Sequence, residues 1–157
     1  MKPTVYIETT IVSYLTAKPS RDLVVAARQQ VTREWWERTS RSFELYASPL
    51  VWQEAAEGDA GAAQRRLAAL ERTKALEIPA AALDLAEAIL ASGIIPAKVA
   101  DDAAHVAIGA VNGMDYLLTW NCTHIANAAN RPRIELLVTR HGYRCPVICT
   151  PDELPNT

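Results

Sequence analysis

The sequence lacks the features that stabilise secreted or membrane-spanning chains. Three of its 157 residues are cysteines, Cys122, Cys145 and Cys149, and no Cys-x-x-Cys spacing occurs. An odd number of scattered cysteines argues against a disulfide framework and fits a reducing cytosol. No segment approaches the roughly 18 uninterrupted apolar residues of a membrane span, and residues 1–3 lead into no apolar signal region. We therefore expect a soluble, cytoplasmic protein without membrane association.

The motifs of several enzyme classes are also missing. The sequence has no glycine-rich phosphate loop, no Ser-His-Asp ordering and no nucleophile elbow. The cysteines and histidines of residues 122–149 match zinc patterns only loosely, and a free cysteine in an apolar strand behaves as a small hydrophobic residue. The net charge of −2 disfavours a protein coated in nucleic acid.

The composition is that of a globular chain. Half of the residues are hydrophobic, and no repeat, linker or low-complexity segment interrupts the sequence. A domain of this length buries roughly 68–70% of its unfolded surface. We therefore expect a single domain over residues 1–157.

Short apolar runs alternate with segments of helical periodicity. Because the runs are continuously apolar, the sequence predicts an α/β fold with a central parallel sheet of about four to five strands, flanked by helices on both faces. The predicted strands cover residues 5–7, 44–47, 116–119 and 147–149. The predicted helices cover residues 9–16, 23–38, 61–70, 81–91, 102–111 and 132–140, with a further helix capped by Ser48 and begun by Pro49.

Four polar residues lie in apolar surroundings where predicted strands end or helices begin. They are Glu8, Glu54, Asp102 and Asn121. An ionised carboxylate beside a core strand needs a partner or a cation, because an uncompensated buried charge costs several kcal/mol or more. Ligands of open parallel sheets bind outside the carboxyl ends of the strands. The pattern therefore predicts a site for Mg²⁺ or Mn²⁺, which prefer oxygen ligands.

Four stretches of the sequence resemble the PIN domain, the fold of VapC-type toxins of bacterial and archaeal toxin–antitoxin systems. They are residues 5–11 (VYIETTI), 48–54 (SPLVWQE), 101–107 (DDAAHVA) and 117–121 (LLTWN), and the third is the most specific. Their order and spacing agree with the family over residues 4–149. The resemblance places Glu8, Glu54, Asp102 and Asn121 on the four acidic, catalytic positions of the family. It places Thr10 on the family's small hydroxyl residue.

The resemblance implies an activity, a cofactor and partners. The chain would be a Mg²⁺- or Mn²⁺-dependent endoribonuclease, the toxin of a toxin–antitoxin pair, which hydrolyses phosphodiester bonds with a metal-activated water. Its partners would be an RNA substrate, a cognate antitoxin and a second copy in a homodimer. Glu8, Glu54 and Asp102 would hold the metal. Thr10, His105 and His124 are expected to support these ligands, and the candidate phosphate contacts are Arg28, Arg33, Arg131 and Arg133.

Two positions depart from the family pattern and leave alternatives open. Glu8 and Asn121 stand where the family usually has Asp, and a neutral Asn121 supplies an oxygen without a charge. A catalytically weak or inactive PIN-like module that binds nucleic acid or protein is therefore an alternative. A small-molecule phosphohydrolase would share the same metal chemistry.

Two pairs of neighbouring residues require a choice. Adjacent helical residues point about 100° apart, so only one of Asp101 and Asp102 can face the site, and the motif favours Asp102. The same geometry predicts that one of Trp35 and Trp36 packs in the core while the other points away, where it could anchor a partner.

The departure at Asn121 generates a prediction. Asn121→Asp adds a negative charge beside the proposed cation, so Mn²⁺ should bind more tightly, each tenfold gain corresponding to about 1.4 kcal/mol. The metal-free variant should be less stable, because a further like charge joins the pocket. Calorimetric titration and the melting temperature of metal-free protein measure the two effects. If both stay unchanged, Asn121 does not face the metal.

Overall fold

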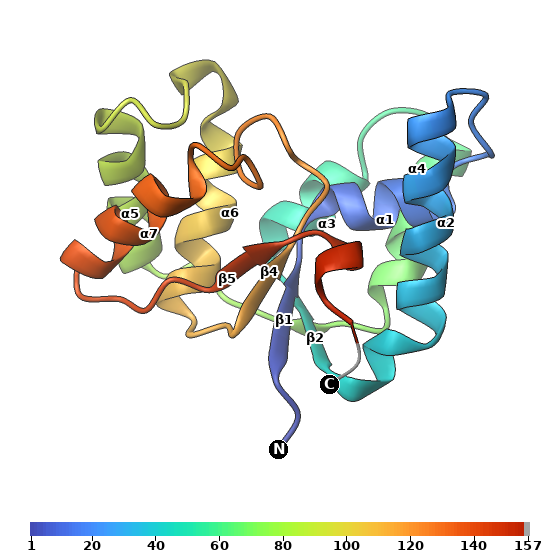
Figure 1. Cartoon of the computed structure of the whole chain (residues 1–157), viewed down its shortest axis with the longest axis horizontal. Helices are drawn as coiled ribbons and strands as arrows, with labels where there is room; N and C mark the ends of the chain where they lie inside the picture. Colours follow the sequence, from blue (N-terminus) through green and yellow to red (C-terminus); the bar gives the residue numbers. More distant parts are fainter. Residues whose placement is uncertain (156–157) are drawn as a thin grey trace.

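A five-stranded parallel sheet forms the centre of the molecule in the computed structural model, which describes residues 1–155 (Figure 1). The strands are β1 (Thr4–Ile7), β2 (Glu44–Ala47), β3 (Lys74–Ala75), β4 (Tyr116–Leu118) and β5 (Val147–Cys149). Their order is β3-β2-β1-β4-β5, and every neighbouring pair is parallel. The carboxyl ends of all strands therefore meet at one edge, with β1 in the middle.

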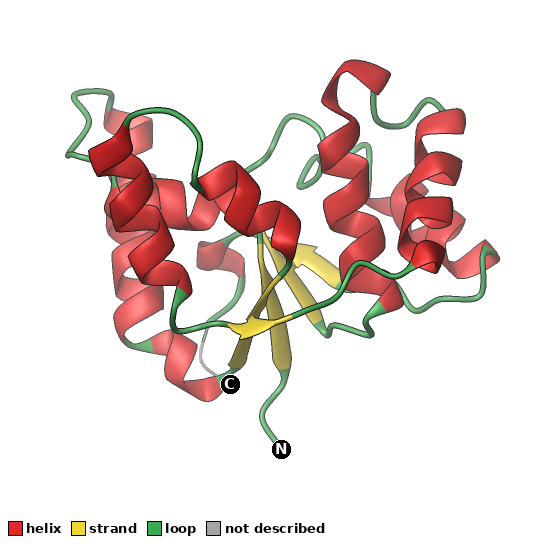
Figure 2. Ribbon diagram, turned by 180° about the vertical axis from the view of Figure 1, so that it is seen from behind, coloured by secondary structure: helices red, strands yellow, loops and turns green. Residues whose placement is uncertain are grey.

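Helices cover the sheet from two sides. They are α1 (Thr9–Thr16), α2 (Leu23–Glu37), α3 (Pro49–Ala55), α4 (Ala60–Leu70), α5 (Ala80–Ala91), α6 (Ala100–Val111) and α7 (Arg131–Arg140). Helices α1 to α4 lie on one side and α5 to α7 on the other (Figure 1), and the view from behind shows the strands between these two groups (Figure 2). The predicted α/β fold is thus confirmed.

Local sequence signals explain where the helices begin and end. Ser48 caps α3 by accepting a hydrogen bond from Val51 N at 3.4 Å, and Pro49 occupies the first helical position, where a missing N–H costs nothing. Gly113 follows α6 with φ +69°, a conformation that a side chain would strain. Short 3₁₀ turns cover Thr39–Ser42, Ala97–Val99 and Pro151–Glu153.

The structure differs from the predicted elements in small ways. Strand β3 was not predicted, because Lys74–Ala75 is two residues long and exposed and so carries no apolar run. Helix α6 begins at Ala100, two residues before the predicted start, and β4 ends at Leu118 instead of residue 119. Asp102 therefore lies in the first turn of α6, and Thr119 just beyond the end of β4.

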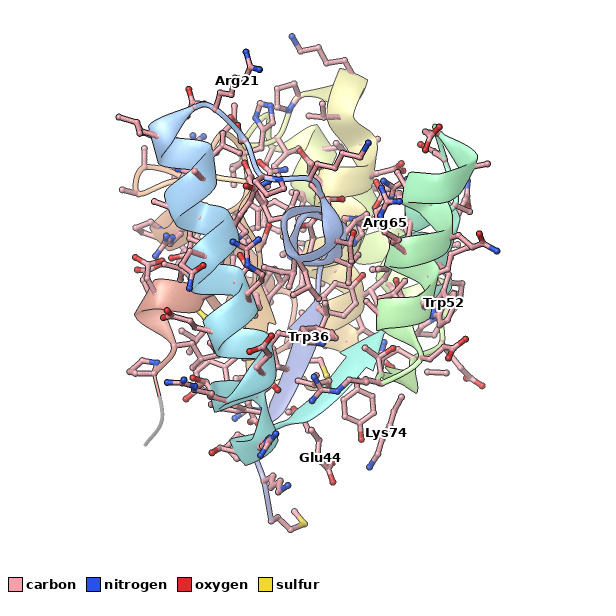
Figure 3. All side chains as sticks on the ribbon, turned by 90° about the vertical axis from the view of Figure 1, so that its right-hand side faces the viewer. Arg21, Trp36, Glu44, Trp52, Arg65 and Lys74 are labelled. Atoms are coloured by element: carbon pink, nitrogen blue, oxygen red, sulfur yellow. The ribbon has the colours of Figure 1, made fainter. Side chains whose placement is uncertain are left out.

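The prediction that one of Trp35 and Trp36 points away from the core is wrong. Both indoles are buried, with exposed fractions of 3% and 7%. Trp35 Nε1 donates to Leu154 O at 2.9 Å, while the Arg72 guanidinium lies 4.9 Å from the ring centroid of Trp36, which Figure 3 labels beside α2. A cation from the segment after α4 thus covers the second indole.

No helix within residues 1–155 has the length and apolar character that crossing a membrane would require.

Trp120 connects the end of β4 to the helices on one side of the sheet. Its Nε1 donates to Thr32 Oγ1 on α2 at 2.7 Å. Its ring packs edge-on against Tyr14 of α1, and the Arg28 guanidinium lies 5.1 Å from the ring centroid. Residues 119 and 121, on either side of this indole, are therefore held in fixed positions.

Removing the acceptor of this indole should destabilise the fold. Thr32→Val leaves the buried Trp120 N–H without a partner, so the free energy of unfolding should fall by about 1–3 kcal/mol in urea titrations. Thr16→Val is the matched control, because the hydroxyls of Thr32 and Thr16 both donate to the carbonyl four residues earlier, at 2.6 and 2.8 Å. Equal losses in the two variants would show that the indole bond contributes nothing.

Candidate metal centre

Glu8 is a buried carboxylate at the carboxyl end of the central strand. Its side chain is 4% exposed and caps α1 by accepting a hydrogen bond from Thr10 N at 3.1 Å. The hydroxyl of Thr10 donates to the same oxygen, Oε1, as does Thr119 Oγ1 at 2.6 Å. Within residues 1–155 the donors to Glu8 all reach Oε1, so Oε2 is available to a cation.

Glu54 projects from the last turn of α3 and is held in a similar way. Its Oε1 accepts hydrogen bonds from Thr9 Oγ1 at 2.6 Å and from His105 Nε2 at 2.5 Å. Burial raises the pKa of Glu54, but the hydrogen bond and charge of His105 and the Thr9 hydroxyl outweigh it, so the pKa lies below its usual range. Glu54 is therefore a charged carboxylate with one oxygen fixed.

His105 is the buried partner of Glu54. Burial lowers the pKa of His105. The hydrogen bond to Glu54 and the charges of Glu8, Glu54 and Asp102 raise the pKa by more than burial lowers it, so the net shift is upward. The opposite shifts of the two pKa values are those of an ion pair.

Asp102 lies in the first turn of α6 and is half-buried, whereas Asp101 is exposed. Burial raises the pKa of Asp102 above its usual range and Glu54 adds to this, although a hydrogen bond from Asn121 and the nearby His105 and His124 oppose it. Asn121 is thus a neighbour that lowers the pKa of Asp102, and its Oδ1 accepts a hydrogen bond from His124 N at 3.0 Å.

The donor set fits a hard divalent cation. One candidate ligand atom each from Glu8, Glu54 and His105 lie within 4.8 Å of one another. Burial is the main cause of the raised pKa of Asp102, and the charge of nearby Glu54 adds to it. Carboxylate oxygens gathered in this way are ligands that Mg²⁺ and Mn²⁺ prefer. Glu8 and Glu54 could therefore hold such an ion, and Asp102, which is not a member of this group of three, lies close enough for Glu54 to influence its pKa.

The structure brings the predicted site residues together around this point. Each has a hydrogen bond or an electrostatic interaction with another member of the set, which comprises Glu8, Thr10, Glu54, Asp102, His105, Asn121 and His124. Four hydroxyl residues that support the site were not predicted from the sequence: Tyr6, Thr9, Ser48 and Thr119. Thr9 donates to Glu54, which is 45 residues away, and no local signal near Thr9 indicates this partner.

The four candidate arginines are not brought together. Arg131 is held by Glu153, to which it donates two hydrogen bonds at 3.0 and 3.1 Å, and Arg33 donates to Gln30 Oε1 at 3.1 Å. Arg133 is exposed on α7. Arg28 and Arg131 both line an apolar groove of about 580 Å³, whose wall includes Leu23, Val24 and Trp120. The groove adjoins the acidic site without containing its carboxylates.

Comparison with known proteins supports the fold. Neither a protein-family model nor a curated protein sequence matches this chain. A chain of VapBC2 from Rickettsia felis, solved bound to a DNA fragment from its promoter, superposes with a TM-score of 0.59 over 94% of this chain and 98% of that chain, at 13% identity. PAE2754 from Pyrobaculum aerophilum gives a TM-score of 0.48 over 88% of both chains, at 19% identity. The likeness to VapBC2 confirms the VapC-like PIN fold that the sequence resemblance predicts.

The raised pKa of Asp102 leads to a pH-dependent prediction. In metal-free protein the protonated form of this group stabilises the fold, and that contribution is lost as pH rises through the raised pKa. Asp102→Asn cannot ionise, so its melting temperature at about pH 7 should exceed that of the parent. The gain should disappear toward about pH 3, below the ordinary carboxyl pKa near 3.9.

Exposed Asp101 supplies the matched control. Asp101→Asn should leave the metal-free melting temperature unchanged at both pH values. With millimolar Mg²⁺ the parent should have a higher melting temperature than Asp102→Asn, because a bound cation stabilises the parent by mass action and the variant has lost a ligand. If Asp101→Asn raises the metal-free melting temperature and Asp102→Asn leaves it unchanged, Asp101 and not Asp102 belongs to the site.

Proposed function

We propose that this chain is a metal-dependent endoribonuclease of the PIN type and the toxin of a toxin–antitoxin pair. The observation that carries the proposal is the grouping of Glu8 and Glu54 at the carboxyl edge of a PIN-like sheet, with Asp102 near enough for Glu54 to influence its pKa. Glu8 follows β1, Glu54 lies in α3 and Asp102 lies in α6, so the three are far apart in sequence. Hydroxyl donors hold Glu8, and a hydroxyl and an imidazole hold Glu54. Such convergence supports a site for Mg²⁺ or Mn²⁺.

The site residues suit hydrolysis of a phosphodiester. A divalent ion supplies an activated water and neutralises charge on the phosphate. Thr10 and Thr119 fix one oxygen of Glu8, and Thr9 and His105 fix one oxygen of Glu54, so each carboxylate presents its other oxygen. This arrangement has no need of a covalent enzyme nucleophile.

The substrate and partners belong to the same proposal. VapBC2 was solved with promoter DNA, and by analogy we propose a cognate antitoxin as partner of this chain. RNA as substrate, a homodimer, a cytoplasmic location and a single domain over residues 1–157 complete the proposal. Arg28, Arg33 and Arg133 remain the better candidates for phosphate contacts, because Glu153 already pairs with Arg131.

A non-catalytic PIN-like binding module is the second candidate function. Asn121 favours it, since the amide supplies no charge and its Oδ1 already accepts the N–H of His124. Only three carboxylates then remain to hold a cation. A binding module should be indifferent to Mg²⁺, which separates the two candidates.

Cleavage of single-stranded RNA tests the proposal. Glu8→Gln and Glu54→Gln keep the shape but remove the charge, so each should reduce the rate by about 100-fold or more. Glu57→Gln, one turn beyond Glu54 and exposed, should stay within about twofold. A chelator should abolish cleavage and added Mn²⁺ should restore it. Cleavage that survives both the chelator and the two variants would reveal a contaminant and favour the binding module.

A further inference from the structure

A buried chain of hydrogen bonds runs behind Glu54. We propose that Ser48, Tyr6 and His105 are positioning residues that orient Glu54, and that His105 acts as a hydrogen-bond donor and not as a metal ligand. The metal-binding part of this inference rests on the proposed function. The proton position on His105 does not, and it can be measured in metal-free protein.

The contact between His105 and Glu54 requires a proton on Nε2. The two atoms lie 2.5 Å apart, and an ionised carboxylate can only accept hydrogen bonds. An imidazole nitrogen that carries a proton has no lone pair for a metal. The proximity of His105 to Glu8 and Glu54 therefore reflects a hydrogen bond, although its distances would also fit a ligand.

Tyr6 holds the opposite side of the imidazole ring. Its hydroxyl lies 2.7 Å from His105 Nδ1 and 2.8 Å from Ser48 Oγ. A hydroxyl can donate or accept, so it satisfies Nδ1 whether or not that nitrogen carries a proton. Nε2 keeps its proton in both cases.

The hydrogen bonds between Ser48, Tyr6 and His105 are buried, which makes this group of residues rigid. Tyr6, Ser48 and His105 are each 0% exposed, so water cannot compete for their hydrogen bonds. The three residues come from β1, the start of α3 and α6 and thus connect the elements that carry Glu8, Glu54 and Asp102. Loss of the Tyr6 hydroxyl should therefore change the orientation of Glu54 without exposing the core.

The consequence is a metal site made of oxygen ligands. With His105 excluded, the candidate ligands are the carboxylates of Glu8, Glu54 and Asp102. A nitrogen ligand would favour zinc and other transition metals, whereas carboxylates and water suit Mg²⁺ and Mn²⁺. The hydrogen bond between Tyr6 and His105 and the proton on His105 Nε2 together keep the site suited to Mg²⁺ and Mn²⁺.

Nitrogen NMR of histidine-labelled protein tests the proton position directly. The chain has three histidines, so His105→Gln assigns the signal by its disappearance. We expect His105 Nε2 to be protonated in metal-free protein and to remain so after saturation with Mg²⁺. An Nε2 without a proton in either state would overturn the inference, whatever the activity of the protein.

Metal affinity tests the positioning role of Tyr6. Tyr6→Phe should weaken Mn²⁺ binding in calorimetry by about 10-fold or more, as loss of partners behind metal ligands typically does. Tyr46→Phe is the matched control, because Tyr46 pairs with Tyr6 in the sheet register and its hydroxyl reaches Glu44 at 3.3 Å, away from the site. Equal affinities in the two variants would contradict the role.

A conservative replacement completes the test. His105→Gln keeps an N–H donor for Glu54, and His105→Leu does not, so the Gln variant should retain more Mn²⁺ affinity than the Leu variant. Equal affinities would show that donation to Glu54 is unimportant. If the parent protein binds no Mn²⁺ while NMR finds Nε2 protonated, the proposed metal site fails and the His105 assignment stands.

Discussion

The burial of Glu8 at the end of the central strand is the constraint on which the site depends. A carboxylate that is 4% exposed must be compensated by nearby donors or cations. The protein supplies the backbone N–H of Thr10, in the first turn of α1, and the hydroxyls of Thr10 and Thr119. All of these engage Oε1, which leaves Oε2 to a cation.

The order of the strands explains why distant residues meet at this carboxylate. From β1 the chain adds β2 and then β3 on one side, and afterwards crosses to place β4 and β5 on the other side. The connections therefore diverge between β1 and β4, and open parallel sheets bind ligands at such switch points. Glu8 follows β1, and Thr119 and Asn121 follow β4, on the two sides of this crevice. The helical groups on either side supply Glu54 from α3 and Asp102 with His105 from α6.

The sequence predicts those features that depend on local chemistry. Apolar runs located four of the strands, and Ser48-Pro49 located the start of α3. Helical geometry and the motif together selected Asp102 over Asp101, and the structure shows Asp101 exposed. The PIN resemblance predicted the fold although the identity to VapBC2 is 13%. The catalytic and metal roles of the site residues remain predictions.

Features that depend on distant contacts were not predictable in this way. Thr119 and Glu8 are 111 residues apart, and nothing near Thr119 in the sequence indicates that its hydroxyl donates to a carboxylate. Arg72, which follows β2, α3 and α4 in the chain, covers the ring of Trp36. The hydrogen bonds between Tyr6, His105 and Ser48 join three elements that only the folded sheet brings together. Strand β3 owes its existence to pairing with β2 and not to its own residues.

A crystal structure of the protein with Mn²⁺, with the ion located by its anomalous scattering, would show directly whether the carboxylates hold a metal. We expect one strong peak among the carboxylates of Glu8, Glu54 and Asp102, coordinated by oxygen atoms, with His105 still bonded to Glu54. An empty site at saturating Mn²⁺, or an ion coordinated by His105 Nε2, would contradict this expectation.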